Sequence, residues 1–160
     1  MEHLTEILKR LNSAQVEYVL VGGLAGVFHG VPLVTRAVDV CMPFTEPNLM
    51  RLERALRDLN PVHRQTPQHL PFSAAEDLPR GLKNIYLRTD LGVLDCLSEI
   101  LGVGDYEAVH QRCLVAELPV GPTRIIDLSA LIDAKSALDR TQDKLALIHL
   151  KRIQKQRNPS

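Results

Sequence analysis

Two aspartates in apolar, strand-like segments are the residues of this sequence best suited to chemistry. Asp39 lies in TRAVDV and Asp95 lies in GVLDCLS. A carboxylate among apolar residues is costly to bury unless it is paired, hydrogen-bonded or bound to a metal ion. If the two strands are neighbours in a sheet, both carboxylates can converge on one Mg²⁺, which prefers oxygen ligands. The alternative for Asp39 is a local ion pair, in which a basic residue such as Arg36 or Arg88 neutralises it.

A glycine pair supplies a second candidate site. Gly22 and Gly23 directly follow the apolar segment VEYVLV, which predicts a buried strand. Glycines after a strand allow a ligand to approach the backbone closely, and a helix that starts there directs its free N–H groups outward, as a phosphate site requires. Most glycine pairs are simple turns, so this pair indicates a phosphate site only together with the downstream aspartates.

Lys135 is the third candidate. The spacing of Leu128, Leu131, Ile132 and Leu138 predicts the buried stripe of a helix, and Lys135 lies within that stripe. A lysine there either extends along the apolar surface to solvent or reaches an interior polar site, where it can contact phosphate. The sequence leaves both alternatives open.

The elements that must position these residues follow from hydrophobic periodicity. Period-3.6 patterns predict helices, and short apolar runs bounded by Gly, Pro or Asn predict strands. The expected order is a helix at 3–12, a strand at 16–23, a short helix at 24–29, a strand at 35–42, a helix at 46–59, a hairpin at 84–98, a short helix before 112, one or two strands within 113–126, and closing helices at 127–138 and 141–157. This order predicts one α/β or α+β domain over residues 1–160, in which helices cover a sheet.

Residues 60–83 interrupt the pattern. The segment contains four prolines among scattered Arg, Gln and His residues. Proline disrupts helices and central strands, so we expect an irregular excursion from the domain. Ser73 and Glu76 have the spacing of a helix cap, which predicts one helical turn inside this excursion.

Composition limits the classes of partner. The 160 residues include 19 basic and 19 acidic side chains, and 45% are apolar, as expected of a soluble globular protein. Balanced charge gives no global field towards nucleic acid or a membrane. The first residues resemble neither a signal peptide nor a membrane span, so we expect a cytoplasmic protein with no membrane partner. Three cysteines without metal-ligand spacing predict buried reduced thiols.

Several motifs together resemble a known family. Gly22-Gly23, then His29-Gly30, then Thr35-Arg36-x-Val38-Asp39 resembles the signature of the polymerase-β-type nucleotidyltransferases, particularly the small bacterial minimal nucleotidyltransferases and the AbiEii-like toxin group. Asp39 matches the second acid of the family's Asp-x-Asp pair, and Asp95 resembles its third acid. The closing segments are also similar, with Lys135, Arg140 and Asp143 at the corresponding places.

The resemblance implies a fold, a reaction and a set of site residues. The fold would be a small mixed sheet with helices packed on one side and two C-terminal helices. The reaction would be Mg²⁺-dependent transfer of a nucleoside monophosphate from an NTP to a hydroxyl of a tRNA, a protein or a small molecule. Asp39 and Asp95 would be catalytic and hold the metal. The nucleotide would bind to Gly22, Gly23, Thr35, Arg36 and Lys135.

Ala37 departs from the family pattern, because it occupies the position of the first catalytic aspartate. In the family that acid bridges two Mg²⁺ ions, so its loss removes ligands from both. We therefore expect nucleotide binding with weak or absent transfer. Two explanations stay open. Ala37 is a deliberate or recent change in an otherwise working enzyme, or the chain is naturally inactive and serves as a nucleotide-binding or toxin–antitoxin partner module.

Overall fold

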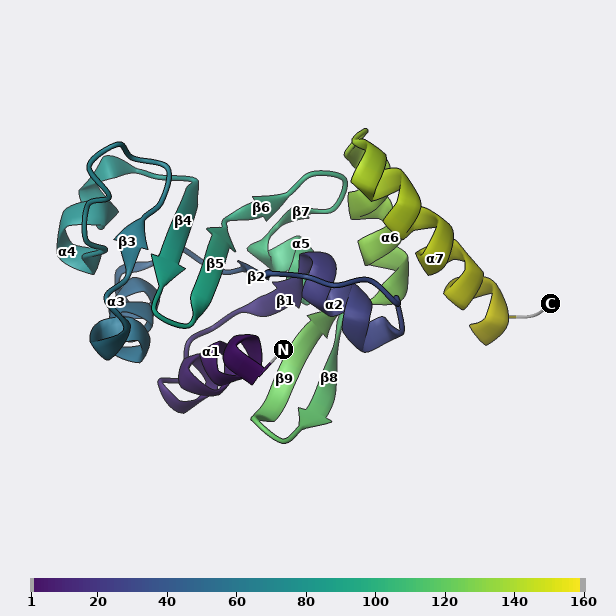
Figure 1. Ribbon diagram of the computed structural model, residues 1–160, viewed down its shortest axis with the longest axis horizontal. Coiled ribbons are helices and arrows are strands. Elements are labelled where there is room, and N and C mark those ends of the chain that lie inside the picture. The colour runs from purple at the N-terminus through teal and green to yellow at the C-terminus, as the bar shows by residue number, and fades with distance from the viewer. Residues whose placement is uncertain (1, 159–160) are drawn as a thin grey trace.

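A seven-stranded mixed sheet forms the centre of the fold in the computed structural model, which describes residues 2–158 (Figure 1). Its strand order is β3-β4-β5-β2-β1-β9-β8. β2 runs parallel to β5 and β1 runs parallel to β9, whereas the other neighbouring pairs are antiparallel. The strands are β1 Val19–Val21, β2 Ala37–Cys41, β3 Val62–His63, β4 Asn84–Thr89, β5 Gly92–Leu97, β8 Cys113–Leu118 and β9 Gly121–Ile126. A separate two-stranded hairpin consists of β6 Glu99–Ile100 and β7 Gly104–Asp105.

Four of the helices begin directly after a capping side chain. Thr45, Ser73, Asp105 and Asp127 each accept a hydrogen bond from a backbone N–H in the first turn of the helix that follows. Figure 1 shows α3 and α4 at the β4 end of the molecule, and α6 and α7 at the opposite end. The helices are α1 Glu2–Ser13, α2 Gly22–His29, α3 Glu46–Leu56, α4 Ala74–Asp77, α5 Tyr106–His110, α6 Leu128–Ala137 and α7 Thr141–Arg157, and two short 3₁₀ turns cover 57–59 and 78–80.

The two faces of the sheet are buried to different degrees. Val38, Val40, Leu94 and Cys96 are fully buried on one face. Helix α1 contacts β2 and β9 and packs against α3, and its own apolar stripe is fully buried. Asp39 and Asp95 alternate with these core residues and are only half-buried, so they lie on the more open face. The expected α/β fold with a small mixed sheet is confirmed.

The excursion at residues 60–83 is more regular than the sequence predicts. Val62 and His63 pair with Arg88 and Leu87 of β4, so the excursion supplies the edge strand β3. A two-residue strand is too short for any periodic pattern to reveal. The predicted helical turn is present as α4, with the Ser73 hydroxyl accepting from the backbone N–H of Glu76.

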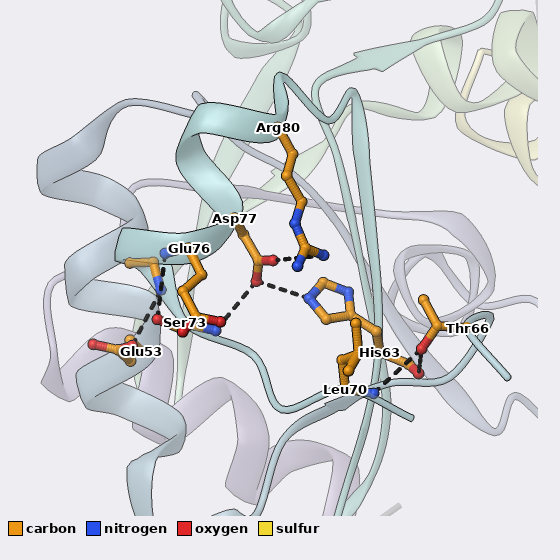
Figure 2. Close-up of polar contacts among 9 residues, drawn as sticks. Glu53, His63, Thr66, Leu70, Ser73, Glu76, Asp77 and Arg80 are labelled. Carbon is orange, nitrogen blue, oxygen red and sulfur yellow. Dashed lines mark hydrogen bonds and ion pairs between the residues drawn. The ribbon is translucent and has the colours of Figure 1, made fainter. Parts of the chain in front are cut away.

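A buried polar cluster joins two parts of this excursion, the strand β3 and the helix α4, as Figure 2 shows. Nε2 of His63 lies 2.7 Å from Oδ2 of Asp77, and both side chains are buried. The same Asp77 oxygen accepts from the backbone N–H of Ser73, and its other oxygen lies 3.4 Å from Arg80. Since buried polar groups are costly without partners, these contacts hold the strand β3 and the helix α4 together.

None of the helices within residues 2–158 combines the length and apolar character required to span a bilayer.

Candidate functional site

Asp39 and Asp95 lie side by side on the open face of the sheet. They are register partners on the parallel strands β2 and β5. Neighbouring strands are about 4.8 Å apart, and register partners project from the same face. The structure therefore brings together the two carboxylates that the sequence singled out, and Ala37, two residues before Asp39, projects from this face without a polar group.

Asp39 has an unfavourable setting for a charged carboxylate. Among residues 2–158 no hydrogen bond or ion pair to its side chain is found. Burial, and secondly the charge of Asp95, raise the pKa of Asp39 to about 6. The positive charges of Lys135, Arg64 and Arg140 offset part of that rise. Asp39 is the member of the pair that is open to a ligand.

Gly22 makes room for this carboxylate. A Cβ at position 22 would overlap Oδ2 of Asp39, and the backbone there has φ +69°, in the left-handed region that favours glycine. The next glycine, Gly23, is less constrained, because a Cβ there would lie 3.1 Å from Oγ1 of Thr35 and that side chain would have to move slightly. The packing of β2 against the start of α2 therefore requires glycine at position 22 and favours a small residue at position 23.

Asp95, in contrast, is fully engaged by a cation. Nε of Arg64 donates to Oδ1 of Asp95 at 3.2 Å, and Nη2 donates to Oδ2 at 2.7 Å. The guanidinium carbon also lies 5.3 Å from the ring centroid of Tyr86, the register partner of Asp95 on β4. The result is a bidentate ion pair stacked on an aromatic ring.

The local ion pair considered for Asp39 does not form. Arg36 and Arg88, the cations considered as its partners, are both exposed, and neither makes an ion pair within the described residues. The cation that binds the acidic pair, through Asp95, is Arg64, which lies far from both strands in the sequence. Arg64 comes from the excursion, where pairing of β3 with β4 places it beside Asp95. The sequence offers no periodic signal for this contact.

A small cavity of about 140 Å³ joins four of the predicted nucleotide-binding residues. Its wall contains Gly22, Gly23, Thr35 and Lys135, which come from three separate parts of the chain. Gly22 and Gly23 form the first turn of α2, where helical N–H groups lack intrahelical partners. Arg36 is exposed and does not line the cavity. The remaining wall is mainly apolar, from Gly26, Val31, Leu33, Val34, Leu131, Gln142, Ala146 and Leu150.

Lys135 is held at this cavity by a buried acid. Its Nζ lies 3.2 Å from Oδ1 of Asp143, whose side chain is completely buried. Arg140 binds the same carboxylate through Nε at 2.6 Å and through Nη2 at 3.1 Å. Burial alone would raise the pKa of Asp143, but the hydrogen bonds from Arg140 and Lys135 hold it below its ordinary value. Lys135 therefore reaches an interior polar site, one of the two alternatives that the sequence left open.

The donor set can be compared with the two-ion centre that the resemblance implies. No group of three or more His, Cys, Asp or Glu side chains within residues 2–158 could hold a metal ion. Ala37 offers no oxygen, and both oxygens of Asp95 accept from Arg64. Of the two paired aspartates, Asp39 alone has oxygens without a side-chain partner among residues 2–158. The residues as arranged do not fit a two-metal site.

Two solved structures resemble the whole chain. The antibiotic-resistance factor ANT(2'')-Ia superposes with a TM-score of 0.58 at 14% identity, over 93% of this chain and 80% of that chain. A Thermotoga maritima protein provisionally named a nucleotidyltransferase gives a TM-score of 0.50 at 18% identity, over 97% of this chain and 86% of that chain. Both neighbours have the nucleotidyltransferase fold. The chain has the nucleotidyltransferase fold.

No protein-family model and no curated protein sequence matches this chain. The nucleotidyltransferase fold is therefore shown by structure alone, and a fold does not determine a substrate. In this chain one carboxylate of the acidic pair is open and the other is bound by an arginine.

Proposed function

We propose that this chain binds a nucleoside triphosphate beside Gly22 and Gly23 and transfers its nucleoside monophosphate weakly or not at all. The observation that supports it is the meeting of the glycine pair, Thr35 and Lys135 at one cavity, with the carboxylates of Asp39 and Asp95 on the adjoining sheet face. Backbone N–H groups and a lysine are the donors that phosphates require.

The reaction is displacement at the α-phosphorus. The oxygen of an acceptor hydroxyl forms a bond to that phosphorus, the bond to the β-phosphate oxygen breaks, and pyrophosphate leaves. The hydroxyl proton passes to a base or to water. The acceptor is a tRNA, a protein or a small molecule. Lys135 and the first turn of α2 hold the phosphates, and Asp39 faces the reacting centre. Charge stabilisation and positioning carry such transfers, so the missing carboxylate at Ala37 lowers the rate.

Restoring the acid tests this proposal. Ala37→Asp is expected to raise transfer from α-labelled NTP, in Mg²⁺ buffer, by about 100-fold or more, the scale of a lost charge-stabilising group. Ala75→Asp adds a carboxylate to the exposed surface of α4 and is expected to change nothing. If neither the wild type nor Ala37→Asp binds an NTP, and the variant gains no transfer, the proposed site is wrong.

A second candidate is favoured by the ion pair between Arg64 and Asp95, which blocks the acid corresponding to the third catalytic carboxylate. In that case the chain is a catalytically inactive module that binds nucleotide or the partner protein of a toxin–antitoxin pair. Purification of the native protein with a second protein in equal amount, and no gain from Ala37→Asp, would favour this candidate over weak transfer.

A further inference from the structure

We propose that Arg64 takes the place of a metal ion at Asp95, so that the phosphates of a nucleoside triphosphate bind to Arg64 and Lys135 without Mg²⁺. The inference rests on the proposed function, because it concerns the same nucleotide site. It assigns a binding role to a residue outside every motif of the family that the sequence resembles.

The first support is the hydrogen bonding of Arg64. A guanidinium has five N–H donors, and Asp95 accepts from two of its nitrogens. The side chain of Arg64 is 26% exposed, and Nη1 donates to no other group within residues 2–158. Arginine recognises phosphate oxygens through such paired donors. The contacts with Arg64 leave Asp95 unable to bind a metal ion. The same contacts hold Arg64 where an anion can bind to it.

The second support is the balance of charge at the site. Asp39, Asp95 and Asp143 supply three carboxylates, and Arg64, Lys135 and Arg140 supply three cations that face them. A site with this balance has no excess negative charge for a divalent cation to neutralise. An aspartate at position 37 would create that excess. The absence of the first acid and the presence of Arg64 are therefore consistent with each other.

The third support is that Arg64 is positioned before any ligand arrives. Its backbone N–H donates to the carbonyl of Tyr86 at 3.0 Å, and its guanidinium stacks on the Tyr86 ring. The preceding residue, His63, is fixed by the buried contact with Asp77 (Figure 2). A charged group that is already ordered loses little freedom when it binds an anion.

The test is isothermal titration of the full-length chain with each of ATP, GTP, CTP and UTP, in Mg²⁺ and in EDTA. For the wild type, the Kd of the nucleotide that binds is expected to agree within about threefold between the two buffers. Arg64→Gln is expected to raise the Kd in EDTA about tenfold or more, the scale of a hydrogen bond to a charged group. Mg²⁺ is expected to restore part of that loss, because Asp95 is then open to a metal ion. Arg88→Gln, which removes an exposed arginine from the adjacent strand, is expected to behave as wild type.

Binding of Mn²⁺ alone, followed by electron paramagnetic resonance, gives a readout without nucleotide. Arg64→Gln is expected to bind Mn²⁺ more tightly than the wild type does. If Arg64→Gln fails to fold by circular dichroism, Arg64→Lys replaces it, since lysine keeps the charge and loses the paired donors; its Kd in EDTA should still rise.

The outcomes separate the two proposals. Wild-type binding that needs Mg²⁺, or a variant at position 64 that binds as the wild type does in EDTA, overturns the role of Arg64 and leaves the proposed function standing. Absence of nucleotide binding in both buffers overturns both.

Discussion

Asp39 is a residue whose ionisation works against the folded state. Its pKa in the folded protein is about 6, above the value of 3.8 for an unperturbed aspartate, because of burial and then the charge of Asp95. The folded state therefore binds the proton more tightly than the unfolded chain does. The stability that this proton contributes is fully present below pH 4 and is lost as the pH rises through 6.

Asp39→Asn removes this dependence. Relative to the variant, the wild type is expected to lose roughly 2 kcal/mol of unfolding free energy between pH 4.5 and 7.5. Urea unfolding of both proteins at the two pH values gives the difference in unfolding free energy between wild type and variant. The contributions of all other titrating groups are the same in both proteins and cancel in this difference. A difference that does not change with pH would show that Asp39 ionises normally in the folded protein.

Single residues also show what the sequence could and could not predict about the site. In TRAVDV and in GVLDCLS, the alternation of side chains was enough to predict which residues share a face of the strand with Asp39 and with Asp95. Strand geometry determines this locally. Arg64 could not be predicted, since it reaches Asp95 only through the pairing of β3 with β4. That pairing depends on two residues in a proline-rich segment and on the distant buried contact between His63 and Asp77.

At the scale of elements, the two C-terminal helices are joined by one buried carboxylate. Asp143, in the first turn of α7, binds Lys135 near the end of α6 and Arg140 in the link between them. Helix α6 also packs on α2, which carries the glycine pair. Asp143 therefore positions Lys135 for the cavity as well as fastening the helices.

Removing that carboxylate is expected to be severe. Asp143→Ala leaves Lys135 without its partner and should lower the unfolding free energy by about 3 kcal/mol, the low end for breaking a buried ion pair, because the exposed Arg140 can return to water. Asp139→Ala is the matched control, since Asp139 is 91% exposed and pairs with the exposed Lys144. Denaturant unfolding compares the two variants. Equal effects would mean that the buried cluster has no special role.

The residue ranges of most helices and strands could be predicted from the sequence, but the order of the strands in the sheet could not. Apolar periodicity located the helices now seen as α1, α3 and α6, because each buries a set of apolar residues along its length. The order of strands depends on contacts between remote segments, which periodicity does not encode. The parallel pairing of β2 with β5, which unites the two acids, is an arrangement of this kind.

At the scale of the whole molecule, the core shields two of the three cysteines. Cys41 and Cys96 lie fully buried in the central strands, and burial raises the pKa of Cys41 to about 12. Cys113, at the start of β8, is half-buried. A disulfide-exchange reagent at pH 8 is therefore expected to label Cys113 first in the native protein, and all three cysteines in guanidinium. Cys113→Ser should abolish the native reaction. Native labelling of Cys41 or Cys96 at the rate of Cys113 would indicate that the core opens readily.

The place of β1 within the sheet has a consequence for biogenesis. β1 lies between β2 and β9, and Leu20 pairs with Ile125. On a ribosome, β1 and β2 emerge long before β9 does. Until then, the apolar β1 strand presents an open edge, to which another unfinished chain can add its own strand. Such distant pairing also slows folding. Productive synthesis of this chain therefore depends on protecting one three-residue strand until residue 126 has been made.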